Sequence, residues 1–385
     1  MYISRLKLLN WRNFDKIELD LVHRVFIVGA NASGKSNLLD VIRFLRDIVK
    51  QAGGLQYAVE QRGGVSKIRC LAARKNTNVE IEVEFSDDKI APWRYRLVFK
   101  HAGGGIVKSQ AIIVEEEVWQ GENRVLFRNI EKEDDETLKF THLEQPTANS
   151  KFRDIYYFLR DVQYLHIVPQ LVRDAESYML SANKEDFYGR NLLDRMNITN
   201  KRTRDSYLKR ISDVLKIAVP QLKELTFVKD DNGVPHLQAV YIHWRAKGAF
   251  QQEKQFSDGT LRLIGFIWAL LDGQETILME EPELYLHTAI VKQLPEFISK
   301  SQKKKNRIRQ VILTTHSYDL ISGDGINSAE VVVLTPSNEG THAETANKIE
   351  KIKNYLEAGF NMADSVIPEV APERIERLLD IKMTD

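Results

Sequence analysis

Eight residues near the amino terminus constrain this chain more than any other feature. Residues 29–36 read G-A-N-A-S-G-K-S and follow the pattern G-x-x-x-x-G-K-S. An apolar, β-branched run precedes them at 24–28, and helical apolar spacing follows over 37–45. Glycines let such a turn point its backbone N–H groups at phosphate oxygens, and the N-terminus of the following helix adds partial positive charge. The sequence therefore predicts a phosphate-binding loop between a buried strand and a helix.

The residue types in this loop predict individual roles. Lys35 is expected to reach the β- and γ-phosphates of ATP, and the Ser36 hydroxyl is expected to ligate Mg²⁺. The alternative is an accidental strand, turn and helix with a surface lysine, which the match of both flanks disfavours. ATP and Mg²⁺ are therefore the predicted cofactors, and the predicted ATP contacts are Gly29, Ala30, Asn31, Ala32, Ser33, Gly34, Lys35, Ser36 and Asn37.

Composition and charge indicate the size class and the compartment of the protein that carries this loop. The 385 residues suffice for two or three structural units, and a net charge of +1 does not call for a polyanionic partner. Cys70 is the single cysteine, which favours a reducing compartment. The amino terminus has no apolar signal segment, and the apolar stretch 261–271 is too short to span a bilayer. We expect a cytoplasmic protein with no membrane partner.

Apolar periodicity changes along the chain and predicts four units. Alternation at 2–8, 16–21, 78–85, 93–99 and 109–116 indicates antiparallel strands, with a turn at 103–105. Residues 149–225 are helical and basic in pattern, interrupted by a strand-like run at 162–169. After a hairpin signal at 229–233, helices and strands alternate, as in a parallel sheet covered by helices. The expected units are an amino-terminal lobe with the phosphate loop (1–135), a helical insertion (136–225), a carboxyl-terminal lobe (226–340) and a helical tail (341–385).

Two adjacent carboxylates end the apolar strand predicted at 276–280. Glu280 is expected to hold Mg²⁺ through its water shell, and Glu281 is expected to orient and deprotonate the attacking water. Proline at position 282 then stops the strand. The alternative is a strand end that dips into solvent, which would be equally good without the phosphate loop upstream. The pair predicts ATP hydrolysis, with water as the acceptor of the phosphoryl group.

Two further elements follow the order expected of one nucleotide site. Ser257 and Gly259 stand at a predicted helix start, where a second phosphate could bind. His316 follows the apolar run 311–315, at the end of a strand where ligands gather in open α/β sheets. A neutral imidazole there can hydrogen-bond a γ-phosphate. The alternatives are a simple helix cap at Ser257 and a structural histidine at 316.

These four elements in this order resemble the ABC-type ATPases that include RecF, the SMC proteins and the ATPase domain of overcoming-lysogenization-defect (OLD) nucleases. The run Asn10–Phe14 is similar to the opening motif of that group, and Glu280–His287 is similar to the Glu-Glu-Pro-Glu-x-x-Leu-His of the OLD-like branch. The resemblance covers about 1–130 and 225–335. It implies an α/β fold of the ABC-type P-loop NTPases, with a mixed sheet core, an antiparallel β lobe and a helical insertion.

The resemblance also implies how the site is completed. Ser257 and Gly259 would bind the γ-phosphate of a nucleotide held by a second copy, which gives a homodimer with ATP between its subunits and leaves a higher oligomer open. Lys35, Glu281 and His316 would be catalytic. Arg12 would approach the nucleotide, and a surface arginine is the equally open alternative. The chain departs from the family at Glu280, where transporters have aspartate, and around Ser257, which lacks the leading leucine and the second glycine. The glutamine loop has only Gln56 and Gln61 as candidates.

Two segments that occur in related ATPases are not expected in this sequence, and this narrows the functions that we expect. Only residues 131–256 separate the lobe from Ser257, without sustained heptads, so a long SMC-type coiled coil is not expected. Residues 317–385 contain no Asp-x-Asp, so the metal-dependent Toprim nuclease domain of OLD proteins is not expected either. We therefore expect a stand-alone ATPase whose nuclease-like effector, where one exists, is a separate chain.

Such an ATPase has three candidate functions. The first is an ATP-controlled dimerisation switch that senses DNA or regulates the effector in DNA repair or anti-phage defence. Basic runs at 201–204, 209–210 and 303–309 are candidate DNA contacts, with solvated surface as the alternative. The second is an ATP-bound scaffold with little turnover that assembles a partner complex. The third, a transporter-type ATPase, would need membrane-embedded partners.

Overall fold

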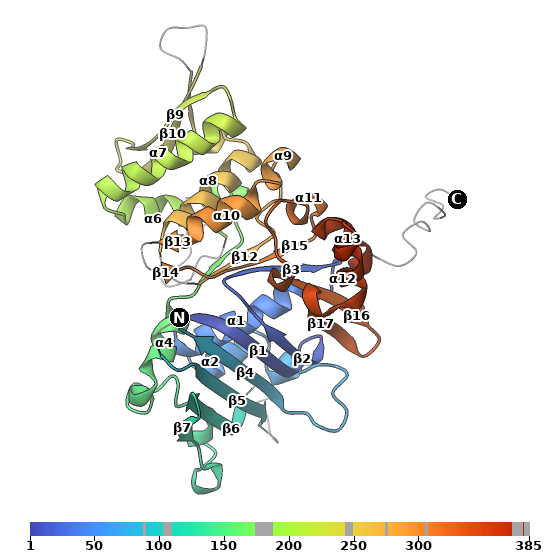
Figure 1. The fold of residues 1–385 in the computed structure, drawn as a ribbon. Helices are drawn as coiled ribbons and strands as arrows, with labels where there is room; N and C mark the ends of the chain where they lie inside the picture. Colours follow the sequence, from blue (N-terminus) through green and yellow to red (C-terminus); the bar gives the residue numbers. More distant parts are fainter. Residues whose placement is uncertain are drawn as a thin grey trace.

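The computed structural model packs two six-stranded sheets around the helix that follows the phosphate loop (Figure 1). It describes residues 1–371 and 380, apart from 88–89, 103–109, 174–187, 243–248, 274–275 and 305–306. The turn expected at 103–105 therefore lies outside the described residues. Within the described part of the chain, no helix is long and apolar enough to cross a membrane.

The central sheet is mixed, with strand order β17-β16-β3-β15-β12-β8. Neighbouring strands run parallel except β16 and β17, which form an antiparallel hairpin. The sheet thus combines strands from both ends and the middle of the chain. Its strands are β3 (Arg24–Gly29), β8 (Gln163–Leu165), β12 (Ile277–Glu280), β15 (Val311–Thr315), β16 (Val331–Ser337) and β17 (Gly340–Thr345).

The second sheet is antiparallel, with strand order β2-β1-β4-β5-β6-β7. In β4, alternate residues are buried and half-buried, as the sequence alternation predicts for a sheet with one wet face. The antiparallel lobe is thereby confirmed. Its strands are β1 (Tyr2–Trp11), β2 (Phe14–Asp20), β4 (Val79–Ser86), β5 (Trp93–His101), β6 (Ala111–Gln120) and β7 (Asn123–Phe127).

The two faces of β3 belong to two different hydrophobic cores. Val25 and Ile27 pack in one core with α1 (Lys35–Val49), α4 (Arg153–Arg160) and the antiparallel sheet. Phe26 and Val28 pack in the other core, which lies on the opposite face. Burial on both faces explains why β3 reads as a continuous apolar run. The second core includes residues of α8 (Asp258–Leu271), α10 (Leu294–Gln302), α11 (Tyr318–Ile321) and α13 (Met362–Val370).

A smaller unit projects beyond the second core, at the top of Figure 1. It consists of helices α6 and α7 packed against a three-stranded antiparallel sheet in the order β11-β10-β9. The expected hairpin around 229–233 joins β9 to β10 and is confirmed. The bounds are α6 (Leu192–Ile198), α7 (Lys201–Ala218), β9 (Leu222–Lys229), β10 (Pro235–Tyr241) and β11 (Ala249–Gln252).

Shorter elements connect these layers. They are α2 (Leu55–Glu60), α3 (Val65–Ile68), α5 (Pro169–Arg173), α9 (Thr288–Val291), α12 (Glu350–Glu357), β13 (Lys303–Lys304) and β14 (Arg307–Ile308).

The structure differs from the expected organisation in two segments. The span 136–225, expected as a helical insertion interrupted by a strand-like run at 162–169, contains that strand as β8, but β8 joins the edge of the central sheet beside β12. The span from 341, expected as a helical tail, begins inside β17 and becomes helical only at α12 and α13. β8 pairs with β12, which is distant in sequence, and local periodicity does not reveal such a partner, whereas β17 pairs with β16, the strand just before it, in a hairpin.

Burial of Glu144 in the amino-terminal lobe makes stability depend on pH. Its carboxylate accepts hydrogen bonds from the backbone N–H groups of Leu55 and Thr141, and burial raises the pKa of Glu144 to about 7. Because the folded chain holds this proton more tightly than the unfolded chain, the contribution is fully present below pH 4.5 and is lost as pH rises toward 7. We predict that the unfolding free energy of the parent, relative to Glu144→Gln, falls by on the order of 3 kcal/mol across this window.

Urea unfolding of both proteins at pH 4.5, 6 and 8 measures this difference. A constant offset between the two proteins, from the altered hydrogen bonds of the amide, does not affect the slope. A difference that is flat across the three pH values would contradict the prediction.

Candidate functional site

The register of the central sheet brings distant residues to one edge. Glu280 at the end of β12 lies opposite Thr314 of β15, and Thr315 lies opposite Val28 of β3. All three strands run parallel, so their carboxyl ends meet where the phosphate loop leaves β3. Ligands of open α/β sheets bind at this kind of edge. The phosphate loop, the two glutamates and His316 are therefore neighbours, as the sequence predicts.

The phosphate loop encloses the side chain of its lysine. The Lys35 Nζ donates to the carbonyl oxygens of Gly29 (2.9 Å) and Ala30 (3.1 Å), and lies 3.8 Å from a carboxylate oxygen of Glu281. Burial lowers the pKa of Lys35, against the opposing charge of the nearby glutamates. The Lys35 ammonium thus donates to neutral carbonyl oxygens. A phosphate group could replace these contacts with stronger, charge-assisted hydrogen bonds.

The backbone of the loop is curled and partly open to solvent. Ala32 has φ of 62° and Gly34 has φ of 99°, in the left-handed region. Asn31, Ala32 and Ser36 are exposed, whereas Ser33 is buried and its hydroxyl has no hydrogen-bond partner. Ser36 stands in the first turn of α1.

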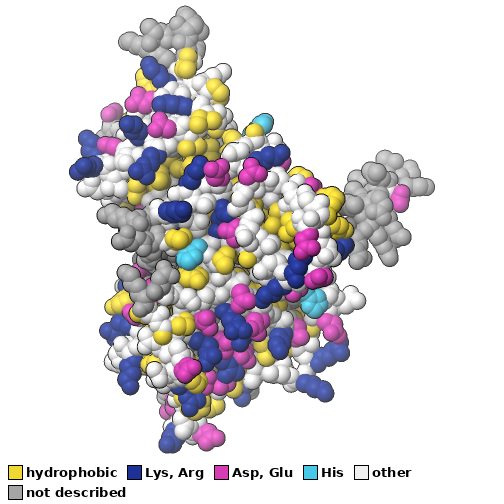
Figure 2. Space-filling model, in the orientation of Figure 1, with side chains coloured by type: hydrophobic (Ala, Val, Ile, Leu, Met, Phe, Trp, Pro, Cys, Tyr) yellow, Lys and Arg dark blue, Asp and Glu magenta, His cyan; other side chains and the backbone are white. Residues whose placement is uncertain are grey.

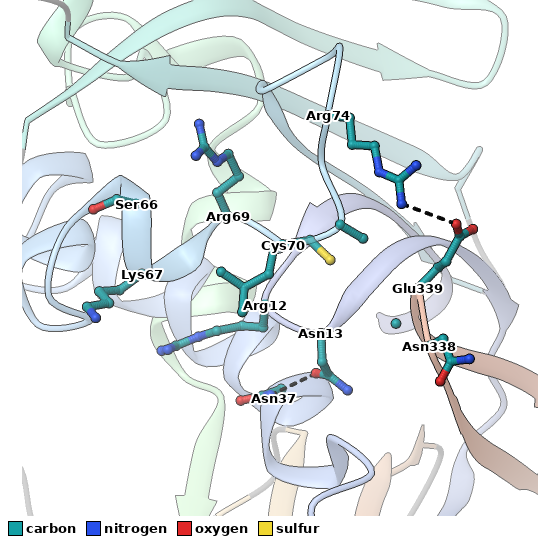
Figure 3. A pocket seen from close by; sticks show the side chains of 13 residues that line it. Arg12, Asn13, Asn37, Ser66, Lys67, Arg69, Cys70, Arg74, Asn338 and Glu339 are labelled. Carbon is teal, nitrogen blue, oxygen red and sulfur yellow. Dashed lines mark hydrogen bonds and ion pairs between the residues drawn. The ribbon is translucent and has the colours of Figure 1, made fainter.

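Asn13 holds this loop in place. Its side-chain amide donates to the carbonyl oxygen of Ser33 (2.9 Å) and to the hydroxyl of Thr341 (2.7 Å), and its oxygen accepts from the Asn37 amide (2.7 Å). A Cβ at Gly34 would come within 2.2 Å of the Asn13 amide, so only glycine fits there. The contact between Asn13 and Asn37 is drawn in Figure 3. Sequence reasoning noted the Asn10–Phe14 motif but did not identify this clamp.

Arg12 lies beside the same loop with its charge partly neutralised. Its backbone has φ of 52°, and its guanidinium donates to the Asp40 carboxylate at 3.1 Å. Arg62 binds both oxygens of Asp40 as well. Burial alone would raise the pKa of Asp40, but the charges of Arg62, Arg43 and Arg12 hold it below its ordinary value. Asp40 therefore stays ionised and orients Arg12 toward the adjoining pocket.

A pocket of about 670 Å³ opens between the start of α1 and the turn that joins β16 to β17 (Figure 3). Arg12, Asn13 and Asn37 form its wall next to the phosphate loop. Arg69, half-buried, points into the same region, and Lys67 and Arg74 add further positive charge, with Arg74 3.6 Å from Glu339. The concentration of cations suits a ligand that carries negative charge. Sequence reasoning missed Arg69 because no motif surrounds it.

The two glutamates at the end of β12 differ in their surroundings. Glu281 contacts the Nδ1 atom of His316 at 3.0 Å, and its backbone N–H donates to the Thr314 carbonyl at 3.1 Å. Its φ of 39° is unusual for a residue other than glycine, and such strain persists where neighbours enforce it. Glu280 instead faces β8, with the Nδ1 atom of His166 3.7 Å away. His166 is a neighbour of the site that the sequence did not indicate.

A third glutamate, Glu283, supports the segment that carries His316. Glu283 is buried, and burial raises its pKa to about 7. One of its oxygens accepts a hydrogen bond from the Thr315 hydroxyl, whose oxygen accepts from the backbone N–H of Ser317 at 2.9 Å. The segment that carries His316 is thus fixed by the Thr315 hydroxyl, which donates to Glu283 and accepts from the Ser317 N–H.

Ser257 and Gly259 occupy a separate position. Ser257 is the N-cap of α8, as predicted, and its hydroxyl oxygen accepts from the Thr260 backbone N–H at 3.2 Å. Arg173 of α5 binds both the Asp258 carboxylate and the Phe256 carbonyl, which fixes the approach to the helix. Among the described residues, no hydrogen bond or ion pair joins Ser257 or Gly259 to residues 29–36.

The glutamine candidates do not reach this site through their hydrogen bonds. The Gln56 side chain donates to the carbonyl oxygens of Ala111 and Lys139, and accepts from the Ala111 N–H, inside the antiparallel lobe. Gln61 lies exposed at the end of α2. The hydrogen bonds of these glutamines therefore do not place either of them beside Glu280. His166, which directly follows β8, lies there instead.

Loss of the Asn13 clamp should loosen the phosphate loop. We predict that Asn13→Ala weakens ATP binding by about tenfold and lowers the unfolding free energy by about 1–2 kcal/mol, because it leaves the Ser33 carbonyl and the Asn37 amide without their partner. Titration with a fluorescent ATP analogue and urea unfolding measure the two effects. Asn76→Ala is a control on an exposed residue outside the pocket, and equal binding by all three proteins would refute the assigned role.

Comparisons with known proteins agree with this geometry. A family model described as "AAA domain, putative AbiEii toxin, Type IV TA system" matches residues 24–322, more than half of the chain. No curated protein matches. Among solved structures, an SMC head bound to the C-winged helix domain of ScpA is similar, with a TM-score of 0.55 at 15% identity, covering 89% of this chain and 97% of that one.

A second similar structure is an SMC head domain with an extended coiled coil, bound to the C-terminal domain of ScpA and derived from Pyrococcus furiosus. It has a TM-score of 0.51 at 13% identity, and the match covers 92% of this chain and 99% of that one. At such low identity these matches show the fold alone, which is the predicted α/β fold of ABC-type and SMC-head P-loop ATPases. With the match over 24–322, the chain belongs to the AAA-domain family whose description is "putative AbiEii toxin, Type IV TA system".

Proposed function

We propose that this protein is an ATP-controlled dimerisation switch that binds and hydrolyses ATP. The observation that carries the proposal is the contact series Lys35, Glu281 and His316 at one sheet edge, with Glu281 3.8 Å from the lysine and 3.0 Å from the histidine. A phosphate cradle next to a carboxylate and an imidazole is the arrangement that ATP hydrolysis needs. The separate helix start at Ser257 is then available to the nucleotide of a second copy.

The residues present fit Mg²⁺. Ser36 offers a hydroxyl, and Glu280 offers a carboxylate at the end of β12, on the same edge of the sheet, so the donors are the oxygen ligands that Mg²⁺ prefers. Bound there, the ion would neutralise charge that develops on the phosphate oxygens. Lys35 and the N–H groups of the loop, from Gly29 to Asn37, would hold the phosphates.

Each remaining side chain has a defined task in this proposal. Glu281 would orient the attacking water and take its proton, since its carboxylate is already aimed by His316. His316 would hydrogen-bond the γ-phosphate, and its contact with Glu281 would change when that phosphate leaves. The pocket beside Arg12 and Asn13 would receive the nucleoside, because it adjoins the start of α1.

The proposal extends to partners on weaker support. The exposed residues Lys201, Arg202, Lys209 and Arg210 of α7 offer DNA a basic helix face, in the part of the molecule where Figure 2 shows scattered Lys and Arg side chains. Arg309 of the run 303–309 is not available, because it is buried and donates to the Ala269 carbonyl at 2.7 Å. Residues 305–306 of that run and Trp244 lie outside the described residues.

The biological setting follows from resemblance. The family description names a putative toxin of a type IV toxin–antitoxin system, and the motif Glu280–His287 resembles the OLD-like branch. Both support a role in defence, in which ATP-dependent dimerisation would regulate a separate, nuclease-like effector. An ATP-bound scaffold with little turnover that assembles a partner complex remains the second candidate.

Two substitutions separate binding from hydrolysis. We predict that Lys35→Ala abolishes ATP binding, whereas Glu281→Gln keeps binding, lowers the hydrolysis rate at least about a hundredfold and accumulates an ATP-bound dimer. Titration with a fluorescent ATP analogue measures binding, phosphate release measures hydrolysis, and size-exclusion chromatography with light scattering measures dimerisation. Glu344→Gln, on β17, is the matched carboxylate control. Turnover by Glu281→Gln at the parent rate would remove Glu281 from the mechanism, and a parent that binds ATP firmly without turnover would favour the scaffold.

A substitution at Ser257 tests whether the second half of the site comes from another copy. In a Glu281→Gln background, we predict that Ser257→Arg still binds ATP but stays monomeric, because a bulky cation at the helix start would block the partner's phosphate. Ser257→Thr keeps an N-cap hydroxyl and should still dimerise. Loss of ATP binding by the Ser257→Arg monomer would instead place Ser257 in the site of its own subunit.

A further inference from the structure

The first turn of α8 lies directly on the loop that carries the catalytic glutamate. Gly259 is so close to this loop that a Cβ there would come within 2.5 Å of the Tyr285 carbonyl oxygen. Arg262, three residues later, is on the same face of the helix. Glu281, Tyr285 and the residues between them form this loop, and its backbone turns are stabilised by hydrogen bonds from Leu284 N–H to the Glu281 carbonyl and from Leu286 N–H to the Glu283 carbonyl.

Arg262 ties the helix to that loop. Its side chain is almost completely buried, and one guanidinium nitrogen donates to the Glu281 carbonyl at 2.6 Å. A second nitrogen donates to the Ile167 carbonyl, next to β8, and the guanidinium lies 5.4 Å from the centre of the Tyr285 ring. A planar fork with several donors fixes the direction of such contacts, which a lysine would not do.

The loop needs this support because its backbone is strained. Glu281 and Tyr285 have φ values of 39° and 65°, both in the left-handed region that residues other than glycine seldom adopt. Glu281 is the residue whose carboxylate meets His316, and Arg262 grips the carbonyl of that same residue. A shift of α8 would therefore be passed to the Glu281 backbone, and from it to the carboxylate.

The same helix begins at Ser257, five residues before Arg262. In the proposed dimer, Ser257 of one subunit faces the nucleotide held by the other, whereas Glu281 of that first subunit serves its own nucleotide. We infer that Arg262 is a positioning residue that couples the two nucleotide sites, by moving Glu281 into place when the start of its own helix is occupied by the partner's phosphate. This inference rests on the proposed function.

The coupling makes a quantitative prediction for mixed dimers. When one subunit carries Lys35→Ala, a single nucleotide remains, and the Glu281 that serves it belongs to a subunit whose own Ser257 faces an empty site. Independent sites would leave such a dimer half of the parent rate. With coupling, we expect less than about one tenth of the parent rate, because Glu281 is not positioned.

Arg262→Gln should uncouple the sites. As a homodimer it should bind ATP with unchanged affinity and hydrolyse it about tenfold more slowly, since Glu281 is less well held. In mixed dimers with Lys35→Ala, with Arg262→Gln in both subunits, the rate should be half of the rate of the Arg262→Gln homodimer. The decisive readout is the rate of the mixed dimer divided by the rate of the corresponding homodimer. We call this ratio the mixed-dimer fraction, and a general loss of stability does not change it.

The experiment uses full-length chains with two different affinity tags, co-expressed and purified through both. The rate of phosphate release is expressed per dimer, with dimers counted by mass photometry in the same sample. Arg309→Gln is the matched control, because Arg309 is equally buried and donates to the Ala269 and Leu270 carbonyls at the other end of α8. Arg309→Gln should lower the melting temperature but leave the mixed-dimer fraction below about one tenth, as in the parent.

The outcomes are distinct. If the parent mixed dimer keeps half of the parent rate, or if Arg262→Gln keeps the depressed fraction, the coupling is refuted while the switch stands. If the parent shows neither turnover nor ATP-dependent dimers, the proposed function fails, and the coupling fails with it. Should Arg262→Gln not fold, Arg262→Lys replaces it, because a lysine keeps the positive charge but cannot fix the direction of contacts to both the Glu281 and the Ile167 carbonyls. Arg262→Lys should move the fraction toward one half, and an unchanged fraction would refute the coupling.

Discussion

The parallel register of β12, β15 and β3 is the constraint on which the site depends. It sets Glu280 opposite Thr314 and Thr315 opposite Val28, so that Glu281, His316 and the phosphate loop emerge at one edge. The register cannot slip by one residue, because the alternate residues of β3 fill two different cores and a slip would exchange them. Hydrophobic packing far from the nucleotide thus fixes the distances at which the chemistry would occur.

The parts of the site that the sequence predicts are those encoded by local patterns. The loop 29–36, the strand ending at Glu280 and the N-cap at Ser257 each depend on residue spacing and helix or strand chemistry within about ten positions. The antiparallel lobe follows from alternation in the same way. These predictions succeed because burial, propensity and turn chemistry point to one structure in each segment.

The parts that the sequence does not predict depend on contacts between distant segments. β8 reads as a short strand, but nothing in it shows that it pairs with β12 and brings His166 to Glu280. Gln56 looks available in sequence, yet the backbone of β6 saturates its amide. Arg262 looks like an interruption of an apolar helix, and only the fold reveals the Glu281 carbonyl as its acceptor. Such roles need three-dimensional neighbours, which a single sequence does not list.

The arrangement of the central sheet has a consequence for synthesis of the protein on the ribosome. The strand that precedes the phosphate loop leaves the ribosome early, but its two sheet neighbours, β15 and β16, begin only at Val311 and Val331. The clamp on the loop comes later still, because Asn13 exchanges hydrogen bonds with Thr341. Contacts of such long range form late in folding. The nascent chain therefore exposes the phosphate loop long before its clamp can form, so a truncated product could contain every residue of the loop and still lack the proposed switch.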